Sequence, residues 1–358
     1  MSTKRASHSQ FQSYLLLGLS LFFVGHFLLL SPSTLEDDFG GMRVIEPKDL
    51  MSFLKNEPKS LVPNLPIDVL PAYSLRDTQF YATDGIEPNL KMTARKSNLY
   101  QKEQLMHARD VVVELADHTL IRSNEAVFFL EKNQINLFGS VHIVFQNGVE
   151  IDSEIATFYT KPVAELIIAQ DQLVQGRKID GNRSTNFVSY GLTYTDSALK
   201  ELHLLSQVKV ELRDDKTTEV VSDHANYQSQ NGQLYFFMNE SRPLSQQFVK
   251  VKQPDLDMKS RKIEVVTGKD RSLATITAVK DVLIRDSHDP KRLAISTSGR
   301  AVYYQKNNDV LLSDFPQVYQ EGDTITGDTI TFHRKTDLIE VKQSNAIYNN
   351  SEPGRLPR

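Results

Sequence analysis

Beyond about residue 75, apolar and polar side chains alternate along the chain. The clearest segments are residues 141–145, 156–160, 208–212, 224–228 and 329–333. A period of two places every second side chain on the same face of an extended strand. Turn-forming residues separate these segments, and no long 3.6-residue pattern follows the N-terminal region. The turn signals lie at residues 146–148, 231–232, 307–309 and 321–323. The sequence therefore predicts an all-β body.

A Ser-x-x-Ala-x-aromatic motif recurs within this body. Its clear copies are Ser123/Ala126/Phe128, Ser153/Ala156/Phe158, Ser222/Ala225/Tyr227 and Ser298/Ala301/Tyr303, with weaker ones at Ser189/Leu192/Tyr194 and Gly327/Ile330/Phe332. The interval of 76 residues from Ser222 to Ser298 predicts a lost copy near Met258. Within each copy the Ala and the aromatic share a face, while the Ser lies on the other face or at the start of the strand. Stacked copies predict a continuous apolar stripe on one inner surface.

The N-terminal segment has a different pattern. Residues 11–30 carry no charge, and twenty helical residues span about 30 Å, which matches the hydrocarbon core of a bilayer. Lys4 and Arg5 precede the segment and acidic residues follow at 36–38, so the positive-inside rule predicts export of everything after it. The alternative is a cleaved signal peptide, for which Ser31-Pro32-Ser33 is a weak cleavage site. The length of the apolar run favours an uncleaved anchor.

Seven of the fourteen prolines fall between residues 31 and 88, which predicts a semi-rigid linker that begins after the anchor. A short helix around residues 49–55 is compatible with this linker. The predicted organisation is a cytoplasmic N-terminus (1–10), a transmembrane anchor (11–30), a Pro-rich linker (31–74), a first β module (75–180), a second β module (181–348) and a tail (349–358).

Composition and motifs argue against several function classes. The net charge is −4, with Lys and Arg scattered among Asp and Glu, so no basic face for nucleic acid is visible. The absence of cysteine excludes a disulfide framework, a thiolate metal site and a Cys nucleophile. No nucleophile elbow, P-loop, dinucleotide fingerprint or zinc-protease motif occurs, and the nine histidines lack metal-ligand spacing. We expect no enzymatic activity, no metal and no cofactor.

Residues 90–100, 121–145 and 148–160 resemble the LptC family, the single-helix inner-membrane component of bacterial lipopolysaccharide transport. Residues from about 188 to 348 are more loosely similar to the OstA/LptA-like repeat, best at 222–237 and 322–341. A typical LptC-like protein is close to a single β-jellyroll. The longer body here predicts two stacked jellyroll modules.

The resemblance implies an open β-jellyroll whose inner face shelters the acyl chains of lipopolysaccharide. Exposure of such chains to water costs about 0.8 kcal/mol per CH₂. The implied location is the bacterial inner membrane, with the body in the periplasm. The implied partners are the inner-membrane ABC transporter of the Lpt system, which supplies energy, and an LptA-like periplasmic protein that joins by edge-strand addition. Alternation assigns the candidate groove lining to Ala126, Phe128, Leu137, Val141, Ile143, Ala156, Phe158, Ala225, Tyr227, Ala301 and Tyr303.

Three hypotheses remain open at the level of sequence. A lipid carrier predicts an apolar channel that is open at both ends and bounded by unpaired end strands. A structural or assembly protein that binds other envelope proteins, and no lipid, predicts a filled, close-packed β core. An adhesin or carbohydrate-binding module predicts a row of exposed aromatic side chains on an outer face. Periodicity alone does not distinguish a filled core from a groove, and a register error of one residue would turn the whole lining outward.

Overall fold

The computed structural model describes residues 60–63, 65, 71–83, 88–160, 165–195, 201–228, 231–268, 272–288, 293–343 and 345–347. The chain divides into two units, residues 1–59 and 60–358, and the described residues all belong to the second. The predicted cytoplasmic segment, anchor, short helix and C-terminal tail lie outside the described residues. No helix among the described residues has the length and apolar character needed to cross a bilayer.

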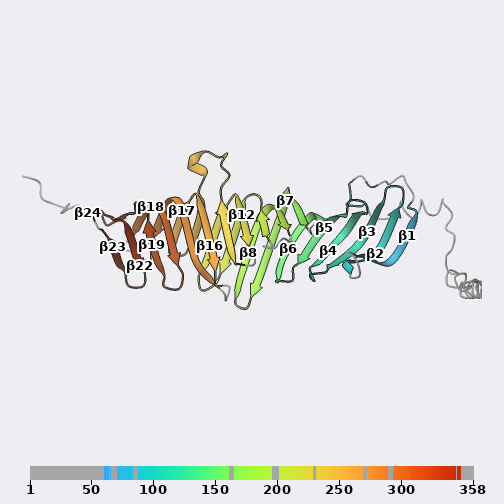
Figure 1. Ribbon diagram of the computed structural model, residues 1–358, viewed down its shortest axis with the longest axis horizontal. Helices are drawn as coiled ribbons and strands as arrows, with labels where there is room; N and C mark the ends of the chain where they lie inside the picture. Colours follow the sequence, from blue (N-terminus) through green and yellow to red (C-terminus); the bar gives the residue numbers. More distant parts are fainter. Residues whose placement is uncertain are drawn as a thin grey trace, which may run out of the picture. The chain divides into compact units, whose positions relative to one another are not determined.

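The described body is all-β, which confirms the prediction from alternation (Figure 1). Its 24 strands form one hydrogen-bonded sheet in which all pairings are antiparallel, and its helical content within the described ranges is one short 3-10 turn, η1 (Leu244–Gln246). The first eight strands are long: β1 (Tyr73–Thr83), β2 (Pro88–Tyr100), β3 (Leu105–Leu115), β4 (Leu120–Phe129), β5 (Gln134–Val144), β6 (Val149–Tyr159), β7 (Glu165–Asp180) and β8 (Arg183–Thr195).

Most of the later strands are about half as long. They are β9 (Glu201–Leu204), β10 (Val208–Arg213), β11 (Thr217–Ser222), β12 (His224–Gln228), β13 (Gln233–Phe237), β14 (Val249–Gln253), β15 (Leu256–Ser260), β16 (Lys262–Thr267), β17 (Leu273–Asp286), β18 (Ala294–Tyr304), β19 (Asp309–Ser313), β20 (Gln317–Gln320), β21 (Asp323–Thr326), β22 (Thr329–His333), β23 (Leu338–Lys342) and β24 (Asn345–Ile347). The long β17 and β18 are the exceptions. All four turn signals named from the sequence lie at junctions between consecutive strands, as predicted, and two of them include the first residue of the following strand, Asp309 or Asp323.

The sheet folds into two layers because each long strand bends near its middle. Register breaks mark the bends, for example between Phe138 and Val141 in β5 and between Val279 and Val282 in β17. The two halves of a bent strand then pair within different layers. In the later part of the chain the bend becomes a break, so that β11 and β12 take the places of one long strand.

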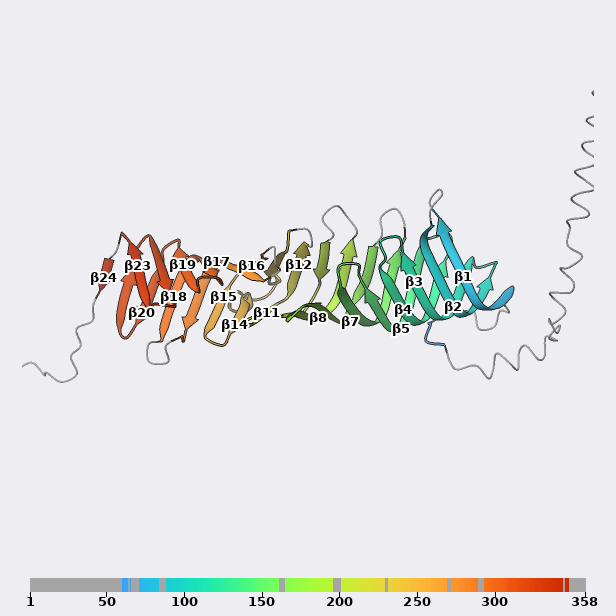
Figure 2. The same cartoon turned by 90° about the horizontal axis from the view of Figure 1, so that it is seen from below.

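We call the two layers leaf A and leaf B. Leaf A contains residues 73–76, 96–100, 105–109, 125–129, 134–138, 155–159, 165–168, 192–195, 273–279 and 300–304 with β9, β12, β13, β16, β19, β22 and β23. Leaf B contains the other halves of the bent strands with β10, β11, β14, β15, β20, β21 and β24. Figure 2 shows β12, β16, β19 and β23 in one layer and β11, β14, β15 and β20 in the other.

Buried serines mark the corner where leaf A meets leaf B. Each serine hydroxyl donates a hydrogen bond to the backbone carbonyl two residues later, at 2.7–3.3 Å, as occurs at Ser123, Ser153, Ser189, Ser222, Ser260 and Ser298. Such a bond satisfies a carbonyl close to where the ladder is interrupted. Ser260 is the lost motif copy expected near Met258. Its Ile263 and Val265 replace the Ala and the aromatic, which hid it in the sequence.

The motif residues form continuous rows on the inner face of leaf A. Cross-strand pairing joins Ala225 through Phe236, Ile263 and Ala278 to Ala301 in one row. The next row holds the motif aromatics, including Phe128, Phe158, Tyr194, Tyr227, Tyr303 and Phe332. Nearly all of these side chains are buried against leaf B in one cluster, so the stripe predicted from the motif is confirmed.

A short segment of the predicted linker packs on the outer face of leaf A. Val62 and Leu65 contact a small cluster formed by Tyr100, Leu105, Val127 and Phe138. Ser60 donates a hydrogen bond to the buried carboxylate of Glu125, and the Leu61 amide donates to the same carboxylate at 3.3 Å. The segment is thus fixed to the sheet through Glu125.

His107 completes this attachment, with its Nε2 2.9 Å from the Glu125 carboxylate. Burial lowers the pKa of His107 below its ordinary value, although Glu125 opposes this effect. Burial raises the pKa of Glu125, but the hydrogen bonds from Ser60, His107 and Leu61 outweigh it and leave the pKa below its ordinary value. The ring is therefore neutral near pH 7 and donates to an ionised carboxylate.

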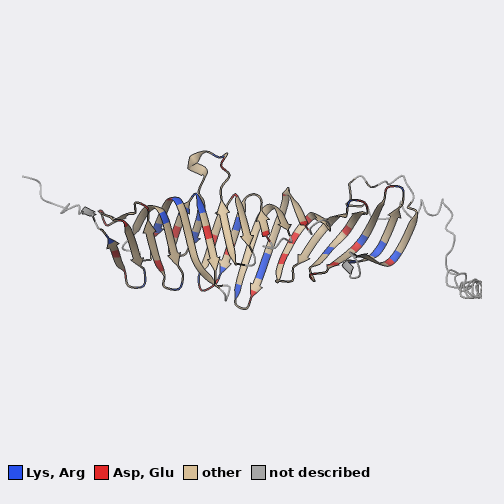
Figure 3. Ribbon diagram, in the orientation of Figure 1, with Lys and Arg blue, Asp and Glu red and all other residues tan. Residues whose placement is uncertain are grey.

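The predicted boundary at 180/181 lies in the turn between β7 and β8, which pair along most of their length. The sheet is continuous there, because β8 also pairs with β9 and β10. The division of the body into two modules stays a prediction. Figure 3 shows Lys and Arg interspersed with Asp and Glu along the strands, in agreement with the sequence.

Candidate functional site

The candidate lining residues all face the space between the two leaves. Those from Ala126 to Phe158, together with Ala225, Ala301 and Tyr303, are buried, and Tyr227 is half-buried against the same cluster. Their inward orientation agrees with the assignment from alternation. Contact of these residues with lipid stays a prediction.

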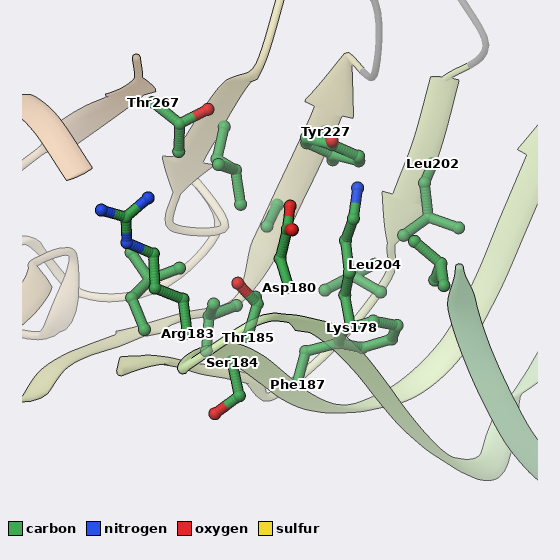
Figure 4. Close-up of a pocket in the computed structure, with 15 residues that line it drawn as sticks. Lys178, Asp180, Arg183, Ser184, Thr185, Phe187, Leu202, Leu204, Tyr227 and Thr267 are labelled. Carbon is green, nitrogen blue, oxygen red and sulfur yellow. The ribbon is translucent and has the colours of Figure 1, made fainter. Parts of the chain in front are cut away.

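A cavity of about 100 Å³ opens between the leaves beside β7–β13 (Figure 4). Leaf A contributes Leu202, Leu204, Ala225, Tyr227 and Leu234 from β9, β12 and β13, and leaf B contributes Val149, Phe187, Val210 and Leu212. These side chains make an apolar floor and walls. Two of the predicted lining residues, Ala225 and Tyr227, therefore border this cavity.

Leaf B also carries a row of inward-facing side chains, and the cavity lies where a glycine interrupts this row. Gly176 pairs with Ile151 of β6 on one side and with Phe187 of β8 on the other. Both of these neighbours in the row are large apolar residues. A Cβ at Gly176 would lie 1.9 Å from Cζ of Phe187, so the Phe187 ring covers the glycine. The ring thus fills the place of the missing side chain and leaves space over the adjacent strands.

The mouth of this cavity carries polar and charged groups. Lys178, Asp180 and Arg183 lie at the tip of the β7–β8 hairpin, and Thr267 lies at the tip of leaf A (Figure 4). Arg183 Nε donates to Asp214 Oδ1 at 3.0 Å, which holds the side chain beside the opening. The site therefore combines an apolar interior with a charged rim. This arrangement suits an amphipathic ligand with apolar chains and a polar head.

Beside β17–β22, the opening between the two leaves is closed by a buried arginine. Arg334 follows β22 in leaf A, and its side chain is 1% exposed. Its Nε and Nη2 donate to the two carboxylate oxygens of Asp286, in leaf B, at 2.7 and 3.1 Å. Nη2 also donates to the Asp255 carbonyl oxygen at 3.0 Å, and Nη1 donates to Asn308 Oδ1 at 2.8 Å. We call these contacts the Arg334 bridge.

Other charged groups surround the bridge. Lys216 Nζ donates to Asp255 Oδ2 at 2.9 Å, and His288 Nδ1 lies 3.3 Å from the same oxygen. Burial raises the pKa of Asp255, but Lys216, Arg334 and His288 outweigh it, so the pKa lies below its ordinary value. Asp255 is therefore ionised at neutral pH and adds to the charge that holds Arg334.

Tyr303, which the sequence assigned to the groove lining, lies beneath this bridge. Its hydroxyl donates to Asn308 Oδ1 at 3.0 Å, and the Arg334 guanidinium is 6.0 Å from the ring centroid. Sequence reasoning missed Arg334 because a basic residue in a turn resembles any solvated loop residue. It also missed Phe187, Leu202 and Leu204, and it noted the alternation at 208–212 without assigning Val210 and Leu212 to the lining.

Comparisons with known proteins bear on the second half of the chain. Residues 219–338 match the family model described as LptA/(LptD N-terminal domain) LPS transport protein. This segment of the chain is thus similar to the LptA/LptD N-terminal domain family. It lies where the sequence is similar to the OstA/LptA-like repeat. The match includes Ala225, Tyr227 and Leu234 at the cavity as well as the partners of Arg334.

A solved structure, that of LptH, the LptA-homologous periplasmic component of the lipopolysaccharide transport device of Pseudomonas aeruginosa, is also similar. The match has 18% identity and a TM-score of 0.32, and it covers 40% of this chain and 91% of LptH. No curated protein matches the chain. The LptC-like character of the segments between residues 90 and 160 stays a prediction.

Proposed function

We propose that this chain is a non-enzymatic carrier of lipopolysaccharide that shelters acyl chains between leaf A and leaf B. The observation that carries the proposal is the apolar cavity beside β7–β13, in a chain whose residues 219–338 match the LptA/LptD N-terminal domain family. Acyl chains would contact Phe187, Leu204 and Ala225, and the polar head would remain at the rim with Lys178 and Arg183. Apolar burial favours this arrangement by about 0.8 kcal/mol per CH₂.

The proposed setting is the periplasm, with residues 11–30 as an anchor in the inner membrane. Energy would come from the inner-membrane ABC transporter of the Lpt system. Among the described strands, β1, β23 and β24 each pair on one side alone, which leaves backbone groups available for strand addition. An LptA-like periplasmic protein is the proposed partner at such an edge.

An assembly protein that binds no lipid is the second candidate. The burial of interior side chains away from the cavity favours it, since Leu137, Ile143 and Ala301 are at most 1% exposed. A carrier requires the leaves to separate in these parts, or requires lipid to use the cavity region alone. Direct detection of lipid at interior positions distinguishes the two candidates.

Photocrosslinking in cells provides this test. A photoreactive amino acid is placed at Phe128, Ile143 or Ala225, which face inward, and in control variants at His142 or Asn226, their outward neighbours. The carrier predicts lipopolysaccharide adducts at Ala225 and not at Asn226. Adducts at Phe128 and Ile143 would extend the lipid path into the first part of the body. Absence of adducts at every inward position would contradict the carrier and favour the assembly protein.

A further inference from the structure

The Arg334 bridge divides the space between the leaves. The cavity beside β7–β13 lies on one side, and a second cavity of about 50 Å³ lies at the C-terminal end. The second cavity is lined by Ala294, Gln320, Phe332 and Ile339, with Arg334 and Asp286 in its wall. The two cavities share no lining residue. A ligand that enters one does not reach the other without passing the bridge.

We propose that Arg334 determines where the acyl-binding part of the interior ends. This inference rests on the proposed function and adds a residue that positions the lipid along the body. An acyl chain offers no hydrogen-bond acceptor, so it cannot replace Asp286, Asp255 or Asn308 around the guanidinium. Displacement of the bridge by such a chain would leave a buried charge without partners, which is strongly unfavourable.

The contacts of Arg334 with residues of both leaves make the bridge a fixed part of the fold. Arg334 joins tips of both leaves: Asp255 lies in the β14–β15 turn and Asp286 ends β17 in leaf B, and Asn308 precedes β19 in leaf A. The bidentate contact with Asp286 constrains both the direction and the plane of the guanidinium. Asp255 is itself held by Lys216 on the preceding hairpin. The boundary is therefore built from several elements of the fold.

Two aromatic residues of the same row provide a matched test. Tyr227 borders the first cavity and Phe332 borders the second, and both belong to the row of motif aromatics. A photoreactive phenylalanine replaces each residue in the full chain, in cells that make lipopolysaccharide. We expect adducts at Tyr227 and, because the bridge excludes acyl chains, adducts at least about tenfold weaker at Phe332.

The bridge is then replaced by apolar side chains in the double variant Arg334→Met/Asp286→Leu. We expect the adduct at Phe332 to increase to within about twofold of that at Tyr227, since the buried ion pair of Arg334 and Asp286 no longer opposes the acyl chain and Asp255 keeps its partner Lys216. Thermal unfolding establishes that the variant is folded. Arg334→Lys is the second variant, because it keeps the charge but loses the bidentate contact. A smaller increase at Phe332 is expected there.

The outcomes separate this inference from the proposed function. Equal adducts at Phe332 and Tyr227 in the unmodified chain would overturn the boundary and leave the carrier intact. An adduct at Phe332 that remains weak in both folded variants would also overturn the boundary, because something other than Arg334 would then exclude lipid. Absence of adducts at both positions in every protein would overturn the carrier, and the boundary with it.

Discussion

The mouth beside β7–β13 and the mouth beside β17–β22 are built on the same rows of side chains. At the first mouth, Gly176 interrupts the inner row of leaf B and a cavity opens behind a charged rim. At the second, Arg334 crosses between the leaves and the space beneath it is filled by Tyr303. The rows hold the leaves together, and the two mouths differ in the residues that interrupt or cross the space between them.

The largest expected effect concerns the closed mouth. Arg334→Met leaves Asp286 buried without its bidentate partner and removes one of the cations beside Asp255, so we expect a loss of about 3–5 kcal/mol in the free energy of unfolding. Arg334→Met/Asp286→Leu removes both partners of the bidentate pair, and most of the loss should be recovered. Urea denaturation measures both values. Equal stability of the single variant and the unmodified chain would show that the bridge does not form in solution.

Two alanines at equivalent positions distinguish the open mouth from the closed one. Ala225 and Ala301 occupy the same row of leaf A, but Ala225 borders the cavity and Ala301 is fully buried. Ala301→Leu should destabilise the protein by about 1–3 kcal/mol, because the added carbons have no space. Ala225→Leu should cost less than about 1 kcal/mol, because the cavity accepts them. Denaturant unfolding compares the two, and similar losses would contradict the assignment of the cavity.

The corner serines should contribute smaller amounts in both regions. Ser260→Ala and Ser189→Ala each remove a hydroxyl that donates to a backbone carbonyl, at 2.7 and 3.1 Å. We expect a loss of about 0.5–1.5 kcal/mol in the free energy of unfolding for each. Ser241→Ala, at an exposed loop position, is the control and should have little effect. If Ser260→Ala and Ser189→Ala lose no more free energy of unfolding than Ser241→Ala, the corner serines do not stabilise the bend.

The smallest expected effect is the response of the 60–65 segment to acid. The pKa values of both His107 and Glu125 lie below their ordinary values, so the unfolded state binds protons more readily than the folded state. Stability from this attachment is therefore complete above about pH 6.5 and decreases as the pH falls, first through His107 and then through Glu125. The hydrogen-exchange protection factors of the Leu61 and Val62 amides, corrected for the intrinsic pH dependence of exchange, should decrease between about pH 7 and pH 5.

His107→Gln provides the control for that measurement. Gln keeps a side-chain amide donor near Glu125 but does not titrate, so the part of the decrease in protection that occurs above about pH 5 should disappear. If His107→Gln responds to acid as the unmodified chain does, groups other than His107 cause the acid effect. The result does not depend on whether the interior binds lipid.

The sequence predicts most of the fold and only part of the site. Alternation predicts the strands and the inward orientation of residues such as Ala126 and Ile143, because a period of two maps directly onto the faces of a sheet. It does not predict the cavity, which depends on Phe187 covering Gly176 from the neighbouring strand. Nor does it predict the Arg334 bridge, whose partners Asp255 and Asp286 are 79 and 48 residues away.

We propose that acyl chains bind between the leaves at the cavity. The most direct test of this proposal is a crystal structure of the full chain crystallised with lipopolysaccharide. We expect acyl density between leaf A and leaf B, in contact with Phe187 and Ala225 and ending before Arg334. Density bound only to the outer faces, with the space between the leaves closed by side chains, would contradict it.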